Sequence, residues 1–418
     1  MARTIARRVE RLRGLRFDRP PRVVVMGEDR LAKVGRSLAR RAQRLERMHP
    51  VRLGARRRLE RASVALDQLA GLLPPESGFG PDTRPTGLDR IGGAFDYPRN
   101  RIIVVPTIIG TRVQLEYTLA HEFTHALESQ HFNLRLGTLT HPSEAASARR
   151  AVVEGSATLV QDLYQHRYLH DDVPLGERID GARSLIGSNP EPYAINAQAV
   201  FDYVDGAEFM LHLYRRAGGW DLVNRALQSP PPDSTQILHP NLWPGTARQV
   251  PVRLGIASRL RSGWHRIGGG PAGEERALVI LLAGALGSEA ETGASGWRGG
   301  RFAVWQPRSS RRQCTGPGCV TGDVGVVAFR WRHRDDASQF RLAVPAYTTL
   351  GLFAQVLSRR AWKLSDGYVA LGTAPRGSAL AFAPHRHLAD WLATRSARSA
   401  SAYDVQSERR GPTRARQG

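Results

Sequence analysis

The sequence His121-Glu122-Phe123-Thr124-His125 places two histidines four residues apart, with a glutamate directly after the first. On an α-helix, residues at i and i+4 lie on one face, so both imidazoles can reach one metal ion. Glu122 is turned by about 100° from His121 and can address a water molecule bound to that metal. Uncharged neighbours favour a helix packed in a core: Leu119, Ala120, Phe123, Thr124 and Ala126. The stretch therefore predicts a metal-binding helix, with Glu122 as general base.

The residues on either side predict where this helix begins and what it packs against. Thr111 and Gln114 have the spacing of a capping box, so the helix is expected to start at Thr111. A second long helix is expected from about Ser143 to about Tyr168. Its inward-facing residues are Val153, Ala157, Val160 and Tyr164.

A catalytic zinc ion needs a third protein ligand and one open position, and two residues compete for this role. His131 has the spacing of the metzincin pattern, but that pattern requires a glycine where this chain has Glu128, a good helix former. If the helix continues, His131 points away from His125. Glu154 lies on the second helix, among apolar neighbours, and completes a His/His/Glu set. We prefer Glu154, and we expect Gly155 and Ala157 to let the two helices approach closely.

Together these residues resemble the gluzincin-like zinc metallopeptidases of high-GC bacteria, over roughly residues 10–345. The resemblance rests on five stretches: Leu12–Leu15, His121–Phe132, Glu154–Ala157, Gln236–Pro240 and Gly296–Phe302. It implies a zinc site at His121, His125 and Glu154, with a peptide or protein as substrate. The chain departs from the family pattern at two positions. Thr235 stands where relatives usually carry an acidic residue, and Thr158 stands where thermolysin-type proteins have an aspartate.

The expected reaction is hydrolysis of a peptide bond by a zinc-activated water molecule. Glu122 would take the proton of that water and deliver it to the leaving amine. A further donor would stabilise the oxyanion, and His239 in the Leu-His-Pro turn is the candidate. Tyr164 or Tyr203 could serve instead.

The chain is expected to be of the α+β class and to contain four parts. A basic segment of helices and a strand covers residues 1–75, and a zincin-like core of helices with a small sheet covers 76–250. A C-terminal α+β subdomain covers 251–394. The Ser/Arg/Gly-rich tail at 395–418 is predicted to be disordered.

The charge is concentrated at the two ends of the chain. The net charge is +22, of which residues 1–62 contribute +14 and residues 395–418 contribute +4. This distribution suggests an alternative function, a non-catalytic zinc-stabilised scaffold whose basic arm binds an anionic partner. Nucleic acid is not the expected partner, because 58 of the 60 cations are arginine, which indicates a compositional bias, and no DNA-binding motif accompanies them.

Two further features bear on location. The longest apolar run, residues 277–287, is shorter than the roughly 20 residues of a spanning helix, so no transmembrane segment is expected. The first residues lack the apolar stretch of a signal peptide, which predicts a cytoplasmic protein. A disulfide between Cys314 and Cys319 would instead fit an exported protein whose true start lies upstream.

Overall fold

The structure is a computed structural model. It describes residues 1–27, 30, 33, 50–75, 92–105, 109–134, 143–170, 173–187, 191–245, 249–256, 260, 263–308 and 322–402. Cys314 and Cys319 lie outside the described residues, so the structure does not decide between a disulfide and two free thiols. The chain has the mixed α+β character expected from the sequence.

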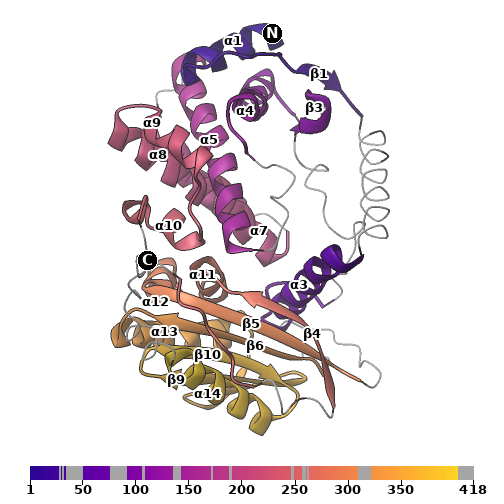
Figure 1. Cartoon of the computed structure of the whole chain (residues 1–418), viewed down its shortest axis with the longest axis vertical. Helices are drawn as coiled ribbons and strands as arrows, with labels where there is room; N and C mark the ends of the chain where they lie inside the picture. Colours follow the sequence, from indigo (N-terminus) through magenta and orange to yellow (C-terminus); the bar gives the residue numbers. More distant parts are fainter. Residues whose placement is uncertain are drawn as a thin grey trace, which may run out of the picture. The chain divides into compact units, whose positions relative to one another are not determined.

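The chain divides into two compact units (Figure 1). The N-terminal unit comprises residues 1–55, 78–191 and 195–245, and the C-terminal unit comprises 56–77, 192–194 and 246–418. The predicted boundary near residue 250 lies close to the observed one. The predicted segment 1–75 is divided between the two units, because its first helix and its last helix pack into different cores.

A three-stranded sheet lies beside the helices of the N-terminal unit. Its strands, in the order β1-β3-β2, are β1 (Arg22–Val25), β3 (Arg101–Val104) and β2 (Gly93–Asp96). β1 runs parallel to β3 and β2 runs antiparallel to it, so β2 is an edge strand. Ile102 and Val104 of β3 are buried against Leu119 and Phe123 of α4 (Arg112–His131). This contact fixes the expected metal-binding helix on the sheet.

The two long helices begin where the sequence predicted. Thr111 accepts a hydrogen bond from the Gln114 amide, and the Gln114 side chain accepts one from the Thr111 amide, which completes the capping box of α4. α5 (Glu144–Tyr168) is capped by Ser143 and packs on α4. Figure 1 shows α5 between α4 and α8.

The remaining helices enclose these two. A π-helical turn, η4 (Val200–Asp205), separates α7 (Tyr193–Ala199) from α8 (Gly206–Ala217). The other helical segments are α1 (Ala2–Arg13), α6 (Glu177–Gly187), α9 (Asp221–Gln228), α10 (Ser234–Leu238), η2 (Tyr97–Arg99) and η5 (Pro240–Leu242).

A buried ion pair holds the N-terminal helix in this unit. The Arg13 Nε of α1 lies 2.8 Å from Glu128 Oε1 of α4, and both side chains are fully buried. Ser156 of α5 donates a hydrogen bond to the same carboxylate oxygen at 2.6 Å, and Arg13 also binds the Asn224 side chain. Removing one member of such a pair leaves an uncompensated buried charge, so α1 is part of the core.

The C-terminal unit is a seven-stranded antiparallel sheet covered by helices. The strand order is β4-β5-β6-β10-β9-β8-β7. The strands are β4 (Trp264–Pro271), β5 (Trp297–Pro307), β6 (Val324–Trp331), β7 (Gln355–Ser358), β8 (Ala361–Leu364), β9 (Gly367–Ala374) and β10 (Gly377–Ala383). The helices are α3 (Pro50–Leu69), which belongs to this unit from residue 56 on, α11 (Glu274–Leu282), α12 (Gly287–Ala294), α13 (Arg334–Ala346) with the π turn η6 (Tyr347–Gly351), and α14 (Arg386–Ala402).

The prediction of a disordered tail beginning at 395 is wrong for its first eight residues. They belong to α14, which packs along β9 and β10. The helix buries small residues at helical spacing, Ala393, Ser396, Ala397 and Ala400, and its backbone comes so close that a Cβ added to Gly372 would lie 1.9 Å from the Ala393 oxygen. Small side chains on both elements permit this close packing. Among the described residues, no helix is long and apolar enough to cross a membrane.

Candidate metal centre

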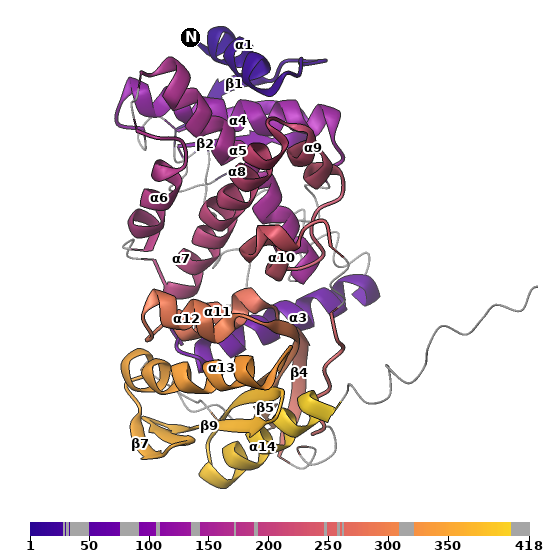
Figure 2. The ribbon, with the colours of Figure 1, turned by 90° about the vertical axis from the view of Figure 1, so that its left-hand side faces the viewer.

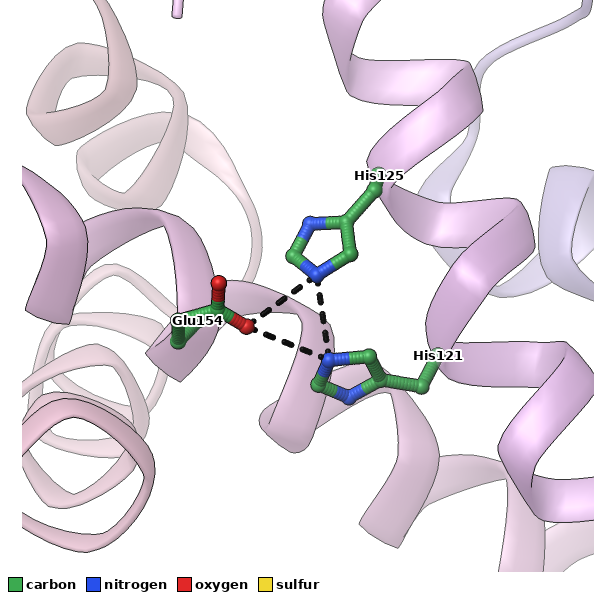
Figure 3. A group of neighbouring side chains, drawn as sticks. All are labelled: His121, His125 and Glu154. Atoms are coloured by element: carbon green, nitrogen blue, oxygen red, sulfur yellow. Dashed lines mark hydrogen bonds and ion pairs between the residues drawn. The ribbon is translucent and has the colours of Figure 1, made fainter. Parts of the chain in front are cut away.

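Three side chains predicted as metal ligands come together in the N-terminal unit (Figure 3). The Nε2 atoms of His121 and His125 are 3.0 Å apart, and the Oε2 atom of Glu154 lies 3.3 Å from the first and 3.2 Å from the second. Both histidines are buried and Glu154 is nearly so. Among the described residues this is the one cluster of three or more His, Cys, Asp or Glu side chains with such convergence.

The arrangement follows from local helix geometry and one helix contact. His121 and His125 are one turn apart on α4, so their rings project from the same face, and their planes stand nearly perpendicular at 85°. Glu154 reaches them from α5, which packs against α4. Figure 3 shows the two histidines on one helix and the glutamate opposite them on another.

A close crossing between α5 and α8 adds a tyrosine to the cluster. A Cβ on Gly155 would lie 2.2 Å from the Gly206 carbonyl, and a Cβ on Gly206 would lie 2.2 Å from the Ala151 oxygen. We expected Gly155 to let α5 approach the histidine helix, but its close contact is with α8. The crossing brings Tyr203 of η4 against the site, where its ring centroid is 6.0 Å from that of His121 and its side chain hydrogen-bonds Glu154.

The π turn also carries Asp202, which is tied to the same helix as Glu154. Arg150, one turn before Glu154 on α5, lies 2.6 Å from Asp202 through its Nε, and Gln198 donates to the other carboxylate oxygen at 3.1 Å. A π turn inserts an extra residue into a helix and is frequently found at functional sites. Here it presents two successive side chains, Asp202 and Tyr203, toward α5.

Glu122 is buried beside the cluster and faces the edge strand of the small sheet. The Phe95 amide of β2 donates a hydrogen bond to its carboxylate. A Cβ on Gly93 would lie 3.1 Å from Glu122 Cγ, so this strand passes directly over the glutamate. Burial raises the pKa of Glu122, and the neighbouring histidines partly offset the rise. A carboxylate with a raised pKa is suited to accept a proton near neutral pH.

The charges of the cluster depend on one another. Burial opposes protonation of His125, but the carboxylates of Glu154, Glu122 and Glu128 together outweigh burial and raise the pKa of His125 to about 9. Burial would raise the pKa of Glu154, yet His125 and His121 hold that pKa well below its usual range. The negative charge of Glu154, followed by burial, raises the pKa of Tyr203 well above its ordinary value. The Tyr203 hydroxyl therefore stays protonated and remains a hydrogen-bond donor.

The structure shows which of the other candidates for the third ligand and for the oxyanion donor lie near the cluster. His131 is the last residue of α4, is exposed, and its Nε2 lies 2.7 Å from the Arg16 carbonyl oxygen, away from the cluster. Tyr164 is buried, and its hydroxyl bonds Arg8 at 2.9 Å and Glu116 at 3.2 Å. Of the two tyrosines considered as oxyanion donors, Tyr203 is the one at the site.

His239 lies in the turn between α10 and η5. Its amide donates to the Thr235 carbonyl at 2.9 Å, and its own carbonyl accepts from the Leu242 amide. α10 meets α5 through a 2.9 Å hydrogen bond from Ser234 to Glu144, which precedes Glu154 by ten residues, or about 15 Å of helix. The oxyanion role of His239 stays a prediction.

The donor set fits a divalent metal ion of the zinc type. Two imidazole nitrogens and one carboxylate oxygen are typical ligands of catalytic zinc, and ligands about 2.0–2.1 Å from a tetrahedral ion stand about 3.3 Å apart. The three observed separations, 3.0 to 3.3 Å, match that spacing. Within the described residues, the buried Nδ1 of His125 and the buried hydroxyl of Thr158 have no hydrogen-bond partner. Thr158 therefore does not replace the aspartate that orients a ligand histidine in thermolysin-type proteins.

Two residues next to the candidate metal centre, Arg150 and Asp202, were not predicted from the sequence. The available signal was the position of Arg150 four residues before Glu154, on the same face of one helix. Nothing local indicated that Asp202 would meet it.

A scan against protein-family models, a search of curated proteins and a search of solved structures each found no match to this chain.

Proposed function

We propose that the protein is a zinc-dependent hydrolase of peptide bonds with a zincin-like core. The observation that carries the proposal is the convergence of three ligand atoms, from His121, His125 and Glu154, with a fourth side chain, Glu122, buried next to them. A structural zinc site is closed by four protein ligands, whereas a catalytic site has three and leaves one position open. The described residues offer three.

The residues of the site divide the chemistry between them. His121, His125 and Glu154 would hold the ion, which when bound supplies a Lewis acid that polarises a carbonyl group and acidifies water. Glu122, which is not a ligand, accepts the proton of the attacking water and passes it to the leaving amine. The Phe95 amide restrains the Glu122 carboxylate through its hydrogen bond.

Tyr203 is better placed than His239 or Tyr164 to stabilise the oxyanion. Its hydroxyl lies at the cluster and stays protonated, so it can donate a hydrogen bond to developing negative charge. Such a donor contributes about 100- to 1,000-fold to turnover in enzymes of known mechanism.

The edge strand supports a peptide as substrate. The Val105 amide bonds the Gly92 carbonyl at 3.0 Å, so in the antiparallel pair that follows, Ala94 and Asp96 point their backbone groups toward β3. The backbone groups of Gly93 and Phe95 point the other way, to the edge beside Glu122. The Phe95 amide bonds the Glu122 carboxylate there, whereas the Gly93 groups and the Phe95 carbonyl have no strand partner among the described residues. An extended peptide can pair with such an edge through its main chain, which would lay its backbone next to the proposed base.

The decisive experiment measures metal content and peptide hydrolysis on the same preparations. Glu122→Gln should keep one zinc ion per chain and lose about 100- to 10,000-fold in turnover, because it removes a base and no ligand. Glu154→Ala should weaken zinc binding by more than about 100-fold, since even outer partners of a ligand contribute 10- to 100-fold. His131→Ala is the matched control and should leave zinc affinity unchanged. Full activity of Glu122→Gln on a peptide that the wild type cleaves would overturn the mechanism.

The alternative function, a non-catalytic scaffold with a basic arm, has less support. A metal ion fully coordinated by protein, with His131 and Glu154 both bound, would favour this scaffold, and His131 is directed elsewhere. Within the basic arm, Arg8 and Arg13 of α1 make ion pairs with Glu116 and Glu128 of α4, so these two cations already have anionic partners in the chain. Zinc bound with no hydrolysis of any peptide in a diverse library would favour this alternative.

A further inference from the structure

Large apolar side chains are exposed together at one end of the C-terminal unit. Leu350 is 64% exposed, Phe353 79%, Val356 58% and Leu286 71%. We call these four residues the apolar patch. Scattered single apolar residues are ordinary on a protein surface, whereas a contiguous group marks a surface that binds something.

The fold brings the four residues to one place. Leu350, Phe353 and Val356 follow one another from η6 into β7, the edge strand of the sheet. A Cβ on Gly284 would lie 2.9 Å from the Gly351 amide nitrogen, so the segment that leads into Leu286 packs against the same turn. Figure 2 shows β7 on the side of the unit where α12 begins.

Phe353 is held outward at a conformational cost. Its φ angle is +51°, in the left-handed region that bulky side chains rarely adopt. The protein therefore accepts both backbone strain and an exposed aromatic ring at this residue. Such outliers persist where they contribute to function, and a binding partner that covers the ring would offset its exposure.

Cations adjoin the patch on the β7–β8 hairpin. The hairpin, residues 355–364, contains Arg359, Arg360 and Lys363 and no carboxylate. All three cations are exposed, and Lys363 lies opposite Gln355 in the strand register. Exposed apolar and aromatic side chains beside basic residues are the combination that binds an anionic membrane surface, with the apolar groups entering the interface and the cations meeting lipid headgroups.

We propose that the apolar patch and the adjacent basic hairpin dock the protein on the surface of a bilayer that contains anionic lipid. A second copy of the chain fits this surface less well. Pairing of β7 with its symmetry mate would join strands of only four residues with an irregular register between Val356 and Ser358. It would also bring the three cations of one hairpin close to those of the other.

Co-sedimentation of the full chain with lipid vesicles tests the proposal. We expect the wild type to pellet with vesicles of phosphatidylcholine and phosphatidylglycerol, and much less with phosphatidylcholine alone. Leu350→Ser with Phe353→Ser should reduce vesicle affinity by about tenfold or more, from the apolar area withdrawn from the bilayer. Arg359→Gln with Arg360→Gln should reduce it by about tenfold and weaken its dependence on salt.

The control separates this surface from the general basic character of the chain. Val25→Ser removes an apolar side chain of the same 64% exposure from the N-terminal unit and should leave vesicle binding unchanged. Three results would overturn the proposal: no pelleting with anionic vesicles, equal binding to neutral vesicles, or patch variants that bind like the wild type. Concentration-dependent dimerisation that disappears in the Leu350→Ser, Phe353→Ser variant, without vesicle binding, would assign the surface to a second copy instead.

Discussion

Asp202 shows how burial sets the charge of a single residue beside the candidate metal centre. Burial is the largest influence on its carboxyl group, and although Arg150 partly offsets it, the pKa of Asp202 is raised to about 7. The negative charge of Glu154 adds to the rise. The folded protein therefore binds a proton on Asp202 over a pH range in which the unfolded chain, with a pKa near 3.8, has released it.

This difference predicts a pH dependence of stability. A raised carboxyl pKa contributes stability that is fully present below about pH 4 and lost as the pH rises through about 7. The free energy of unfolding of the wild type should therefore fall relative to that of Asp202→Asn across this range, by at most about 1.4 kcal/mol per pH unit. Urea unfolding of both metal-free proteins at a series of pH values measures the difference. An advantage of the wild type that stays constant or grows with pH would show that Arg150 keeps Asp202 ionised throughout.

At the scale of elements, the crossing of α5 and α8 determines what surrounds the proposed ligands. Gly155 and Gly206 are in backbone contact, and each lies within a few residues of a side chain of the cluster. Glu154 directly precedes the first glycine, and Tyr203 precedes the second by three residues. The spacing of the two helices therefore sets the hydrogen bond between Tyr203 and Glu154.

Gly206→Ala tests this crossing. The added methyl group would lie 2.2 Å from the Ala151 oxygen, so the helices must separate. We expect a loss of about 1–3 kcal/mol or more in the free energy of unfolding and a weaker affinity for zinc. Gly181→Ala in α6 is the matched control, because nothing lies within 4 Å of its added carbon. It should stabilise the protein by about 0.5–1 kcal/mol through helix propensity and leave zinc affinity unchanged. Equal effects of both substitutions would contradict the importance of the crossing.

At the scale of the whole molecule, the metal centre and the large sheet belong to different units. All the proposed ligands and Glu122 lie in the N-terminal unit, and the sheet that carries the apolar patch lies in the C-terminal unit. Each unit has a buried core of its own. A substitution that disrupts one core should therefore destabilise mainly the unit that contains it.

Gly372→Ala tests whether the metal centre depends on the C-terminal unit. Its added carbon would lie 1.9 Å from the Ala393 oxygen, which forces α14 away from β9. We expect faster amide exchange in β9, β10 and α14, measured by mass spectrometry, with one zinc ion still bound per chain. Loss of zinc from this variant would show that the metal centre depends on the C-terminal unit.

The sequence by itself determined the features that depend on neighbours within one or two helical turns. The capping box at Thr111, the helix that it begins and the shared face of His121 and His125 all follow from local spacing, because an α-helix repeats every 3.6 residues. The preference for Glu154 over His131 rested on the same local reasoning, and the structure brings Glu154 to the histidines. The start of α5 after Ser143 was predicted for similar reasons.

Only the tertiary structure decided which helix meets which. The sequence placed Gly155 in a close contact but could not name its partner, because a glycine permits an approach from any element small enough to fit. The π turn that presents Asp202 and Tyr203 does not show in the helical periodicity. The last turns of α14 looked like a polar tail because small alanines and serines carry a weak apolar signal. They are ordered since β9 and β10 offer a glycine-containing surface on which small side chains pack closely, and that surface exists only once the sheet has formed.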